Sequence, residues 1–129
     1  MNDEPVLHAD QIKPNDDVSI IDLTADPYPD KRRVKVYFRL SFFQQPPNAA
    51  ISLYGKGDEP LAYVNIVSIF NPENEVTLHI PGSRVQKGAY RVVLTLFDLK
   101  EREAREDEKG EVRLETQKLG SETINFIIT

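Results

Sequence analysis

Alternation between apolar and polar residues runs through most of this chain and predicts β-strands. The clearest case is RVKVYFRLSFF (33–43), whose odd-numbered positions are mostly charged or polar. Its apolar residues share the opposite side of the strand: Val34, Val36, Phe38, Leu40 and Phe42. A period of two residues is typical of a strand with one face in a core and the other in water. We predict seven strands, over 17–23, 33–43, 49–54, 61–70, 75–80, 89–98 and 122–128.

Turn signals at short intervals separate these strands and favour an all-β fold. QQPPN (44–48), GKGDEP (55–60) and NPEN (71–74) are rich in residues that form turns. TADPYPDKRR (24–33) is predicted to be a loop, because its two prolines do not fit inside a sheet. Many short strands with such turns, and no convincing helix, predict an antiparallel β-sandwich of about seven strands.

The first sixteen residues and the rest of the chain differ in character. Residues 1–16 contain Pro5, Pro14 and several acids, and we expect a loosely ordered lead-in there. Residues 17–129 then form a single domain, which a chain of 129 residues can build around a real core.

The charged segment between the last two strands (99–120) is predicted to be a long hairpin arm. DEKG (107–110) suits a tight turn with glycine in the left-handed position. Folding there pairs Leu94 with Ile124 and Val92 with Phe126, which brings two apolar faces together.

Toward the tip of this arm the same register is less favourable. It places Glu103 opposite Glu115 and Arg105 opposite Arg113, and like charges in these positions repel. We therefore expect either that the tip frays or that a bulge near LGS (119–121) shifts the register.

Composition narrows the classes of function. Hydrophobic residues make up 40% of the chain, charged residues 29%, and the formal net charge is −5, so the overall basic balance of a nucleic-acid binder is missing. No apolar run approaches the roughly 20 residues of a membrane-spanning helix. The absence of cysteine excludes disulfides and thiolate metal sites, and it suits a cytoplasmic location.

The C-terminal half resembles immunoglobulin-like and fibronectin type III-like sandwiches. The residues that carry the resemblance are GAYRVVLTLFD (88–98), an alternating strand that begins with Gly-x-Tyr. The resemblance implies that Tyr90 is a tyrosine-corner residue, whose hydroxyl bonds to nearby backbone. Val92 stands where antibody domains have a cysteine, and the chain has no tryptophan. The same strand, ending in an acidic residue, also resembles the sugar-binding C-terminal domains of O-antigen exporters, which implies a carbohydrate ligand as an alternative.

A second resemblance is to C2 domains, which bind calcium and anionic lipid. DPY (26–28), VKVYF (34–38), NPENE (71–75) and FDLKERE (97–103) occur in the order of corresponding motifs in that family. The resemblance implies a calcium site in the loops, for which the candidates are Asp26, Asp30 and Asp98. Lys100 stands where the family has its next aspartate, so a complete calcium site is not expected, and we expect no cofactor.

Other chemistry-bearing residues favour a non-catalytic protein. His8 and His79 are the two histidines, and the sequence has neither a phosphate-binding glycine loop nor a paired-carboxylate motif, so an enzyme is not expected. Arg33, Lys35 and Arg39 line one strand face together with Tyr37. We expect them to pair with acids on the flanking strands, Asp17 and Glu75, rather than to bind an anion.

The most informative feature is apolar and lies on an outer sheet face. Strand 61–70 is apolar on both sides, and the outer sides of strands 89–98 and 122–128 also carry apolar residues. Exposed apolar patches often mark interfaces, although loop residues such as TADPYPD could fold over this face. The expected interface residues are Tyr54, Tyr63, Val67, Val93, Thr95, Phe97 and Ile127. We expect a protein-interaction module, with a protein partner or homodimer at this face; the alternative is a carbohydrate-binding or calcium/lipid-binding sandwich that uses its loops.

Overall fold

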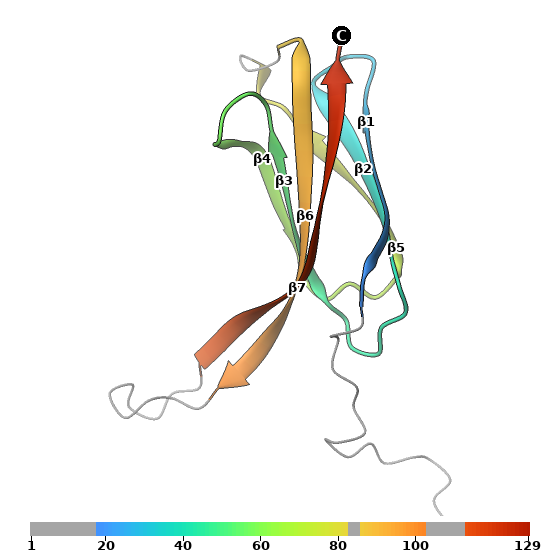
Figure 1. Ribbon diagram of the computed structural model, residues 1–129, viewed down its shortest axis with the longest axis vertical. Helices are drawn as coiled ribbons and strands as arrows, with labels where there is room; N and C mark the ends of the chain where they lie inside the picture. Colours follow the sequence, from blue (N-terminus) through green and yellow to red (C-terminus); the bar gives the residue numbers. More distant parts are fainter. Residues whose placement is uncertain (1–17, 83–85, 103–112) are drawn as a thin grey trace, which may run out of the picture.

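The fold of the described residues is an all-β arrangement of two antiparallel sheets (Figure 1). The computed structural model describes residues 18–82, 86–102 and 113–129. One sheet has the strand order β1-β2-β5 and the other β4-β3-β6-β7, and the described part of the chain contains no α-helix. The strands are β1 (Ile20–Pro27), β2 (Arg33–Leu40), β3 (Asn48–Tyr54), β4 (Pro60–Ile66), β5 (Glu73–His79), β6 (Gly88–Arg102) and β7 (Arg113–Ile128). The predicted fold class and the number of strands are confirmed, whereas the lead-in predicted over 1–16 lies outside the described residues.

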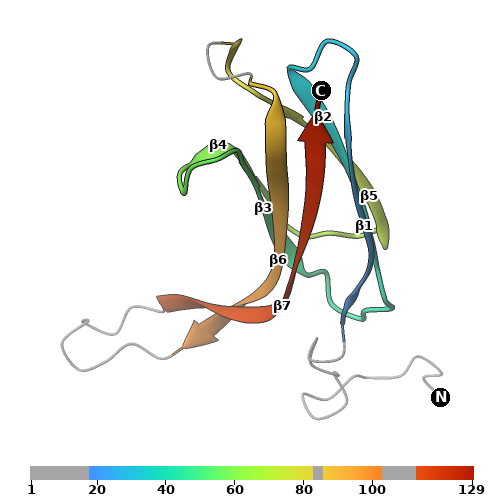
Figure 2. The same cartoon turned by 45° about the horizontal axis from the view of Figure 1, so that its top comes forward.

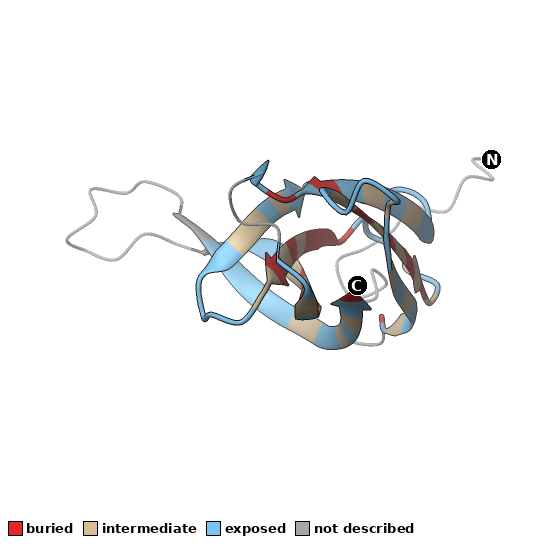
Figure 3. Cartoon of the chain, turned by 90° about the horizontal axis from the view of Figure 1, so that it is seen from above, coloured by how far each residue is buried: buried red, intermediate tan, exposed pale blue. Residues whose placement is uncertain are grey.

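The core lies between the two sheets and takes one side of each strand. Figure 3 colours the chain by burial and shows bands of buried residues along the strands. Along β2, buried and less buried residues alternate strictly from Val34 to Leu40, as the sequence pattern predicts. Ile51 and Leu53 of β3 and Leu94 of β6 are fully buried. Because each sheet supplies one apolar layer, the other side of each sheet is left free for other uses.

β1 extends into the segment that was predicted to be a loop. The strand continues through Asp26 to Pro27, and Pro27 lies opposite Val34. The prediction was wrong because β1 is an edge strand, and proline is tolerated where its missing N–H would face away from the sheet. The chain reverses direction between β1 and β2 in a short turn. In this turn the Lys31 N–H donates to the Tyr28 carbonyl, and Lys31 has a positive φ of 62°.

Two strands end earlier than the alternation predicts. β2 stops at Leu40, where the backbone begins to bond elsewhere: the Leu40 N–H donates to the Pro72 carbonyl and the Ser41 N–H to Ser19. Phe42 was predicted to point inward, but its side chain is 84% exposed.

β4 likewise stops at Ile66, where a backbone reversal interrupts the predicted strand 61–70. Ser68 has a positive φ of 58°, and Ile69 rather than its neighbours enters the core. Val67 and Phe70 are left exposed. Part of the apparent two-sided apolar pattern therefore reflects a turn and not a second strand face.

The final hairpin has the predicted faces but a different register. Val92 pairs with Ile124 and Tyr90 with Phe126, which is a slip of two residues from the expected pairs. A slip of two leaves every side chain on the same face, so alternation cannot detect it. The turn assumed at 107–110, which set the expected register, lies outside the described residues.

A bulge divides this hairpin into a sheet part and an arm. Leu96 pairs with Gly120 but Phe97 pairs with Lys118, so Leu119 is the extra residue, and the predicted bulge near 119–121 is confirmed. Beyond it β6 and β7 turn away from the body of the sandwich (Figure 2), as expected because bulges bend strands. The expected Glu103–Glu115 pair was wrong, since Glu115 lies opposite Lys100.

Candidate interaction surface

The outer face of the four-stranded sheet brings most of the predicted interface residues together. The register defines two rows across the sheet in the order β4, β3, β6, β7. The first is Tyr63, Ser52, Val93 and Thr123, and the second is Asn65, Ala50, Thr95 and Ser121. We call these rows, with Tyr54, Arg91, Asn125, Ala89 and Ile127 on the same side of the sheet, the outer face.

Small side chains occupy the centre of the outer face, and larger ones lie at its margins. Val93 and Thr95 are half-buried, and the Thr95 and Ser121 hydroxyls lie 3.3 Å apart in a hydrogen bond. Tyr63 at the β4 margin is 58% exposed, and Ile127 at the β7 margin is 67% exposed. The most exposed large side chains, Tyr63 and Ile127, therefore lie at the two margins of the outer face, on either side of a centre formed by smaller side chains.

One predicted interface residue is already engaged by a charged neighbour. The Arg91 guanidinium lies over the Tyr54 ring, 4.3 Å from its centroid, in a cation–π contact. Arg91 is the sole charged residue among the described outer-face positions. The Tyr63 hydroxyl donates to Asn65 Oδ1 at 2.8 Å, and its aromatic ring stays exposed to solvent.

The remaining two predicted interface residues, Val67 and Phe97, lie beyond the outer face, where the arm meets the body. Val67 follows the end of β4, and Phe97 is the first residue after the bulge. A small cavity of about 240 Å³ at this junction is lined by Val67, Ser68 and the start of the arm.

Asn48 holds this junction together and was not singled out by sequence reasoning. Its side chain is buried, at 6% exposure. Nδ2 donates to the Phe97 carbonyl at 3.3 Å, and Oδ1 accepts the Ser68 N–H at 2.9 Å. An asparagine after two prolines is typical of a turn, so the sequence signal pointed to a loop and not to a buried bridge.

The outer side of the three-stranded sheet has the opposite character. Cross-strand positions there hold charged residues on all three strands: Asp22, Asp26, Arg33, Lys35, Arg39, Glu73 and Glu75. The two sheets thus differ sharply in the chemistry of the sides that face away from the core.

Two residues of the predicted cationic strip on β2, Arg33 and Arg39, are paired with acids, although not with the expected ones. Arg39 forms an ion pair with Asp22 at 2.8 Å, and this bond raises the pKa of Arg39. The Tyr37 hydroxyl donates to Glu73 at 3.2 Å. Desolvation, followed by the effect of Glu73, raises the pKa of Tyr37. Glu75 lies opposite Tyr37 in the register, and Asp17 lies outside the described residues.

At the end of this strip Arg33 and Asp30 close the β1–β2 turn. Arg33 Nε lies 3.0 Å from Asp30 Oδ2, and the guanidinium also lies over the Tyr28 ring. The Arg32 N–H donates to Asp30 Oδ1 at 2.9 Å. That backbone bond, with further help from Arg33, lowers the pKa of Asp30.

The three aspartates considered for calcium are not brought together. Asp26 and Asp30 lie at the β1–β2 turn, whereas Asp98 lies at the start of the arm, at the opposite end of the molecule (Figure 1). Among the described residues no group of three or more metal-ligating side chains gathers. Asp30 instead works as a turn residue, through its bonds to Arg32 and Arg33.

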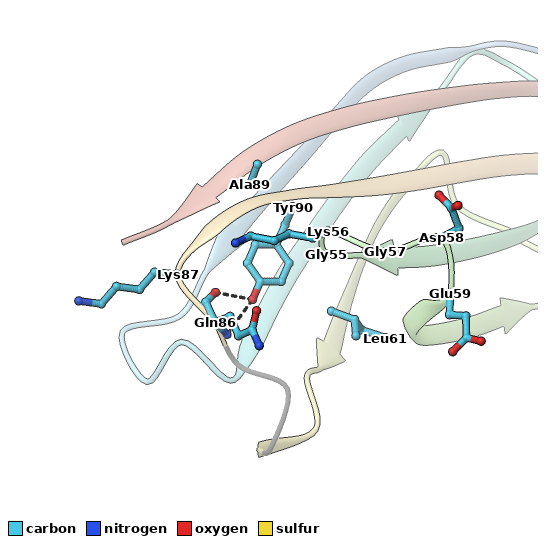
Figure 4. Close-up of a pocket in the computed structure, with 10 residues that line it drawn as sticks. All are labelled: Gly55, Lys56, Gly57, Asp58, Glu59, Leu61, Gln86, Lys87, Ala89 and Tyr90. Atoms are coloured by element: carbon cyan, nitrogen blue, oxygen red, sulfur yellow. Dashed lines mark hydrogen bonds between the residues drawn. The ribbon is translucent and has the colours of Figure 1, made fainter.

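A cavity of about 430 Å³ lies at the end of the four-stranded sheet, beside the β3–β4 loop (Figure 4). Tyr90 and Leu61 contribute apolar surface, and the charged lining residues, such as Lys56 and Glu59, are exposed. Lys87 points away from the Tyr90 ring in this view.

Tyr90 is fixed by its own hydroxyl, as the tyrosine-corner resemblance implies. The hydroxyl donates to the Gln86 carbonyl and accepts the Gln86 N–H at 3.0 Å (Figure 4). The Tyr90 ring also stacks on Phe126, with centroids 5.7 Å apart. Tyr90 therefore anchors the backbone at Gln86, just before β6 begins.

The remaining observations concern the histidines, membrane-spanning helices and the comparison with known proteins. His79 is exposed, as predicted, and His8 lies outside the described residues. In the described part of the chain no helix is long and apolar enough to cross a membrane. No protein-family model matches the chain, and no curated protein is significantly similar to it in sequence.

Proposed function

We propose that this chain is a non-catalytic protein-interaction module built on a fibronectin type III-like sandwich. Two observations support that fold assignment. The Tyr90 hydroxyl makes the backbone bonds of a tyrosine corner. The fourth strand also joins the sheet of the third and sixth strands, whereas in constant-type immunoglobulin domains it joins the sheet of the first, second and fifth.

The observation that carries the proposed function is the contrast in charge between the two outer sides. Charged residues are depleted at the centres of protein interfaces, and tyrosine is enriched there. The outer face of the four-stranded sheet follows that pattern, with Tyr54 and Tyr63 and a single charged residue, Arg91. The three-stranded sheet follows the pattern of a solvated surface.

The first partner to consider is a second copy of this chain, through the four-stranded sheet. Most homo-oligomers are twofold-symmetric dimers in which one patch contacts itself. Burial of charged side chains in such a contact costs free energy unless each of them is well paired. The outer side of the three-stranded sheet carries the seven charged residues named above, whereas the outer face carries one, Arg91. A cysteine-free chain is suited to this role in a reducing compartment such as the cytoplasm.

Sedimentation equilibrium over a wide micromolar range, without calcium, tests the proposal. We expect the wild-type chain to dimerise. Tyr63→Lys places a charge on the exposed margin of the outer face, and we expect it to weaken association at least about tenfold. Tyr63→Phe keeps the ring and should still dimerise.

The matched control is Thr24→Lys, which adds the same charge at an exposed position on the outer side of β1. This variant should dimerise like the wild-type chain. A strictly monomeric wild-type protein would overturn the self-association proposed here. Equal weakening by Thr24→Lys and Tyr63→Lys would show that the effect comes from net charge and not from the four-stranded sheet.

A further inference from the structure

β4 forms a free edge of the four-stranded sheet, and most of its length lacks the features that normally guard an edge strand. β4 ends the strand order β4-β3-β6-β7, and Figures 1 and 2 show it at the side of the sheet. Alternate residues of an edge strand point their backbone N–H and C=O groups away from the sheet, where another strand can pair with them. Natural proteins normally guard such an edge with charged side chains, proline or bulges.

The other sheet margins carry these safeguards. β1 has Asp22 and Asp26, a bulge near its start and Pro27 at its end. β5 contains Glu73 and Glu75. β7 lies beside β1.

β4 differs from each of these strands. Its sequence, PLAYVNI, has no charged residue, and its two safeguards, Pro60 and a bulge at Leu61, both lie at the very start of the strand. Ala62 to Ile66 therefore offer an uninterrupted and uncharged strand edge.

We propose that β4 pairs antiparallel with β4 of a second copy, so that two four-stranded sheets become one eight-stranded sheet. This inference rests on the self-association proposed above and names its geometry. An antiparallel pair related by a twofold axis is self-complementary, because each residue meets the same partner on both copies. Centred on Tyr63, the pairing places the two Tyr63 rings side by side on one face.

The charges near the ends of β4 are compatible with this register. Residue numbers of opposing positions within β4 then sum to 126, so no charged residue lies in the paired segment, and Asp58 and Glu59 lie in the loop before it. No acidic residue faces another, although each copy carries a net charge of −5. Opposing residues point to the same side of a sheet, so the two outer faces also join into one continuous face.

Edge pairing and face-to-face docking differ in how far the centre of the outer face lies from the second copy. Val93 lies in the same cross-strand row as Tyr63, but two strands away from β4. With neighbouring strands about 4.8 Å apart, Val93 is about 14 Å from the second copy's β4 in the edge-paired dimer. In a face-to-face dimer Val93 would be near the centre of the contact.

Three variants in one cross-strand row decide between the two. Tyr63→Lys, Val93→Lys and Thr123→Lys each add one lysine to the row, at the β4 margin, the centre and the β7 margin. By sedimentation equilibrium we expect Tyr63→Lys alone to weaken the dimer, at least about tenfold, because the two lysines would face each other. Circular dichroism checks that each variant is folded.

Amide hydrogen exchange gives a second and more direct readout. In the edge-paired dimer, alternate β4 amides that exchange fast in dilute solution become protected at concentrations where the dimer forms. Face-to-face docking leaves those edge amides unbonded. Loss of the dimer in Val93→Lys, or no concentration-dependent protection in β4, overturns edge pairing and leaves the proposed self-association standing. A monomeric wild-type chain overturns both.

Discussion

Removal of the Tyr90 hydroxyl tests how this sandwich anchors its sixth strand. Tyr90 is buried, and its hydroxyl both donates to the Gln86 carbonyl and accepts the Gln86 N–H. Tyr90→Phe keeps the ring, and with it the stacking on Phe126, and deletes both hydrogen bonds. Any loss of stability then comes from the polar contacts and not from a cavity.

The size of the effect follows from what the substitution leaves behind. A typical intramolecular hydrogen bond contributes about 1 kcal/mol net, and a buried backbone group without a partner costs about 1–3 kcal/mol. Gln86 is itself exposed, so water can satisfy part of the loss. We therefore expect the free energy of unfolding to fall by about 2 kcal/mol.

Urea denaturation followed by circular dichroism measures this change. With a slope near 1.5–2 kcal/mol/M for a chain of this size, the midpoint should fall by about 1 M while the slope stays constant. Tyr63→Phe is the control, because the Tyr63 hydroxyl donates only to the exposed Asn65 side chain, and its midpoint should hardly move. The reasoning is refuted if Tyr90→Phe unfolds at the wild-type midpoint, since the hydroxyl would then contribute nothing.

Two further predictions concern polar contacts elsewhere in the fold. Asn48→Ala leaves the Ser68 N–H and the Phe97 carbonyl without this partner. Since Ser68 is exposed and Phe97 half-buried, water can replace part of the loss, and the free energy of unfolding should fall by about 1–2 kcal/mol in the same urea assay. A change below about 0.5 kcal/mol would contradict the bridging role. The lowered pKa of Asp30 means that its carboxylate stabilises the fold above about pH 4, and that this contribution is lost as the pH falls through the lowered value. Asp30→Asn should therefore flatten the acid limb of the stability–pH curve, and identical limbs for the two proteins would exclude such a contribution.

The strands were largely predictable because their cause is local. One buried face and one solvated face impose a period of two, and β2 shows that period without interruption. Errors arose where a non-local contact overrides the local pattern. Phe42 continues the alternation in sequence, but the backbone at Leu40 and Ser41 already bonds to other segments, and the side chain is left in solvent.

The register of the final hairpin and the identity of the edge strands could not be predicted from the hydrophobic pattern, for a different reason. A two-residue slip of β7 keeps every face, so the pairing of Val92 with Ile124 cannot be distinguished from the expected one by hydrophobicity. Pro27 was excluded from a strand because its place at the sheet margin depends on the strand order. The bulge was anticipated from like charges facing each other in the simple register of the arm, although the observed register still places Arg102 opposite Arg113.

The candidate surface was predictable in its members but not in its arrangement. Tyr63, Val93 and Thr95 do share the outer face, because alternation fixes which side of each strand they occupy. That Arg91 lies over Tyr54, and that Val67 follows a turn at the arm junction, depends on side-chain packing and on the positive φ of Ser68. Neither leaves a signal in a single sequence.

The difference in charge between the two outer sides has no cause in the folding of the sandwich itself. Each sheet needs one apolar layer for the core, and the chain could place charges freely on the other side. The three-stranded sheet uses that freedom, with Arg39 paired to Asp22 across two strands. The four-stranded sheet does not, and neither does its edge strand β4, although an uncharged edge exposes a protein to unwanted strand pairing. Since charged residues are abundant elsewhere in the chain, we attribute their absence from β4 to a partner strand that occupies that edge.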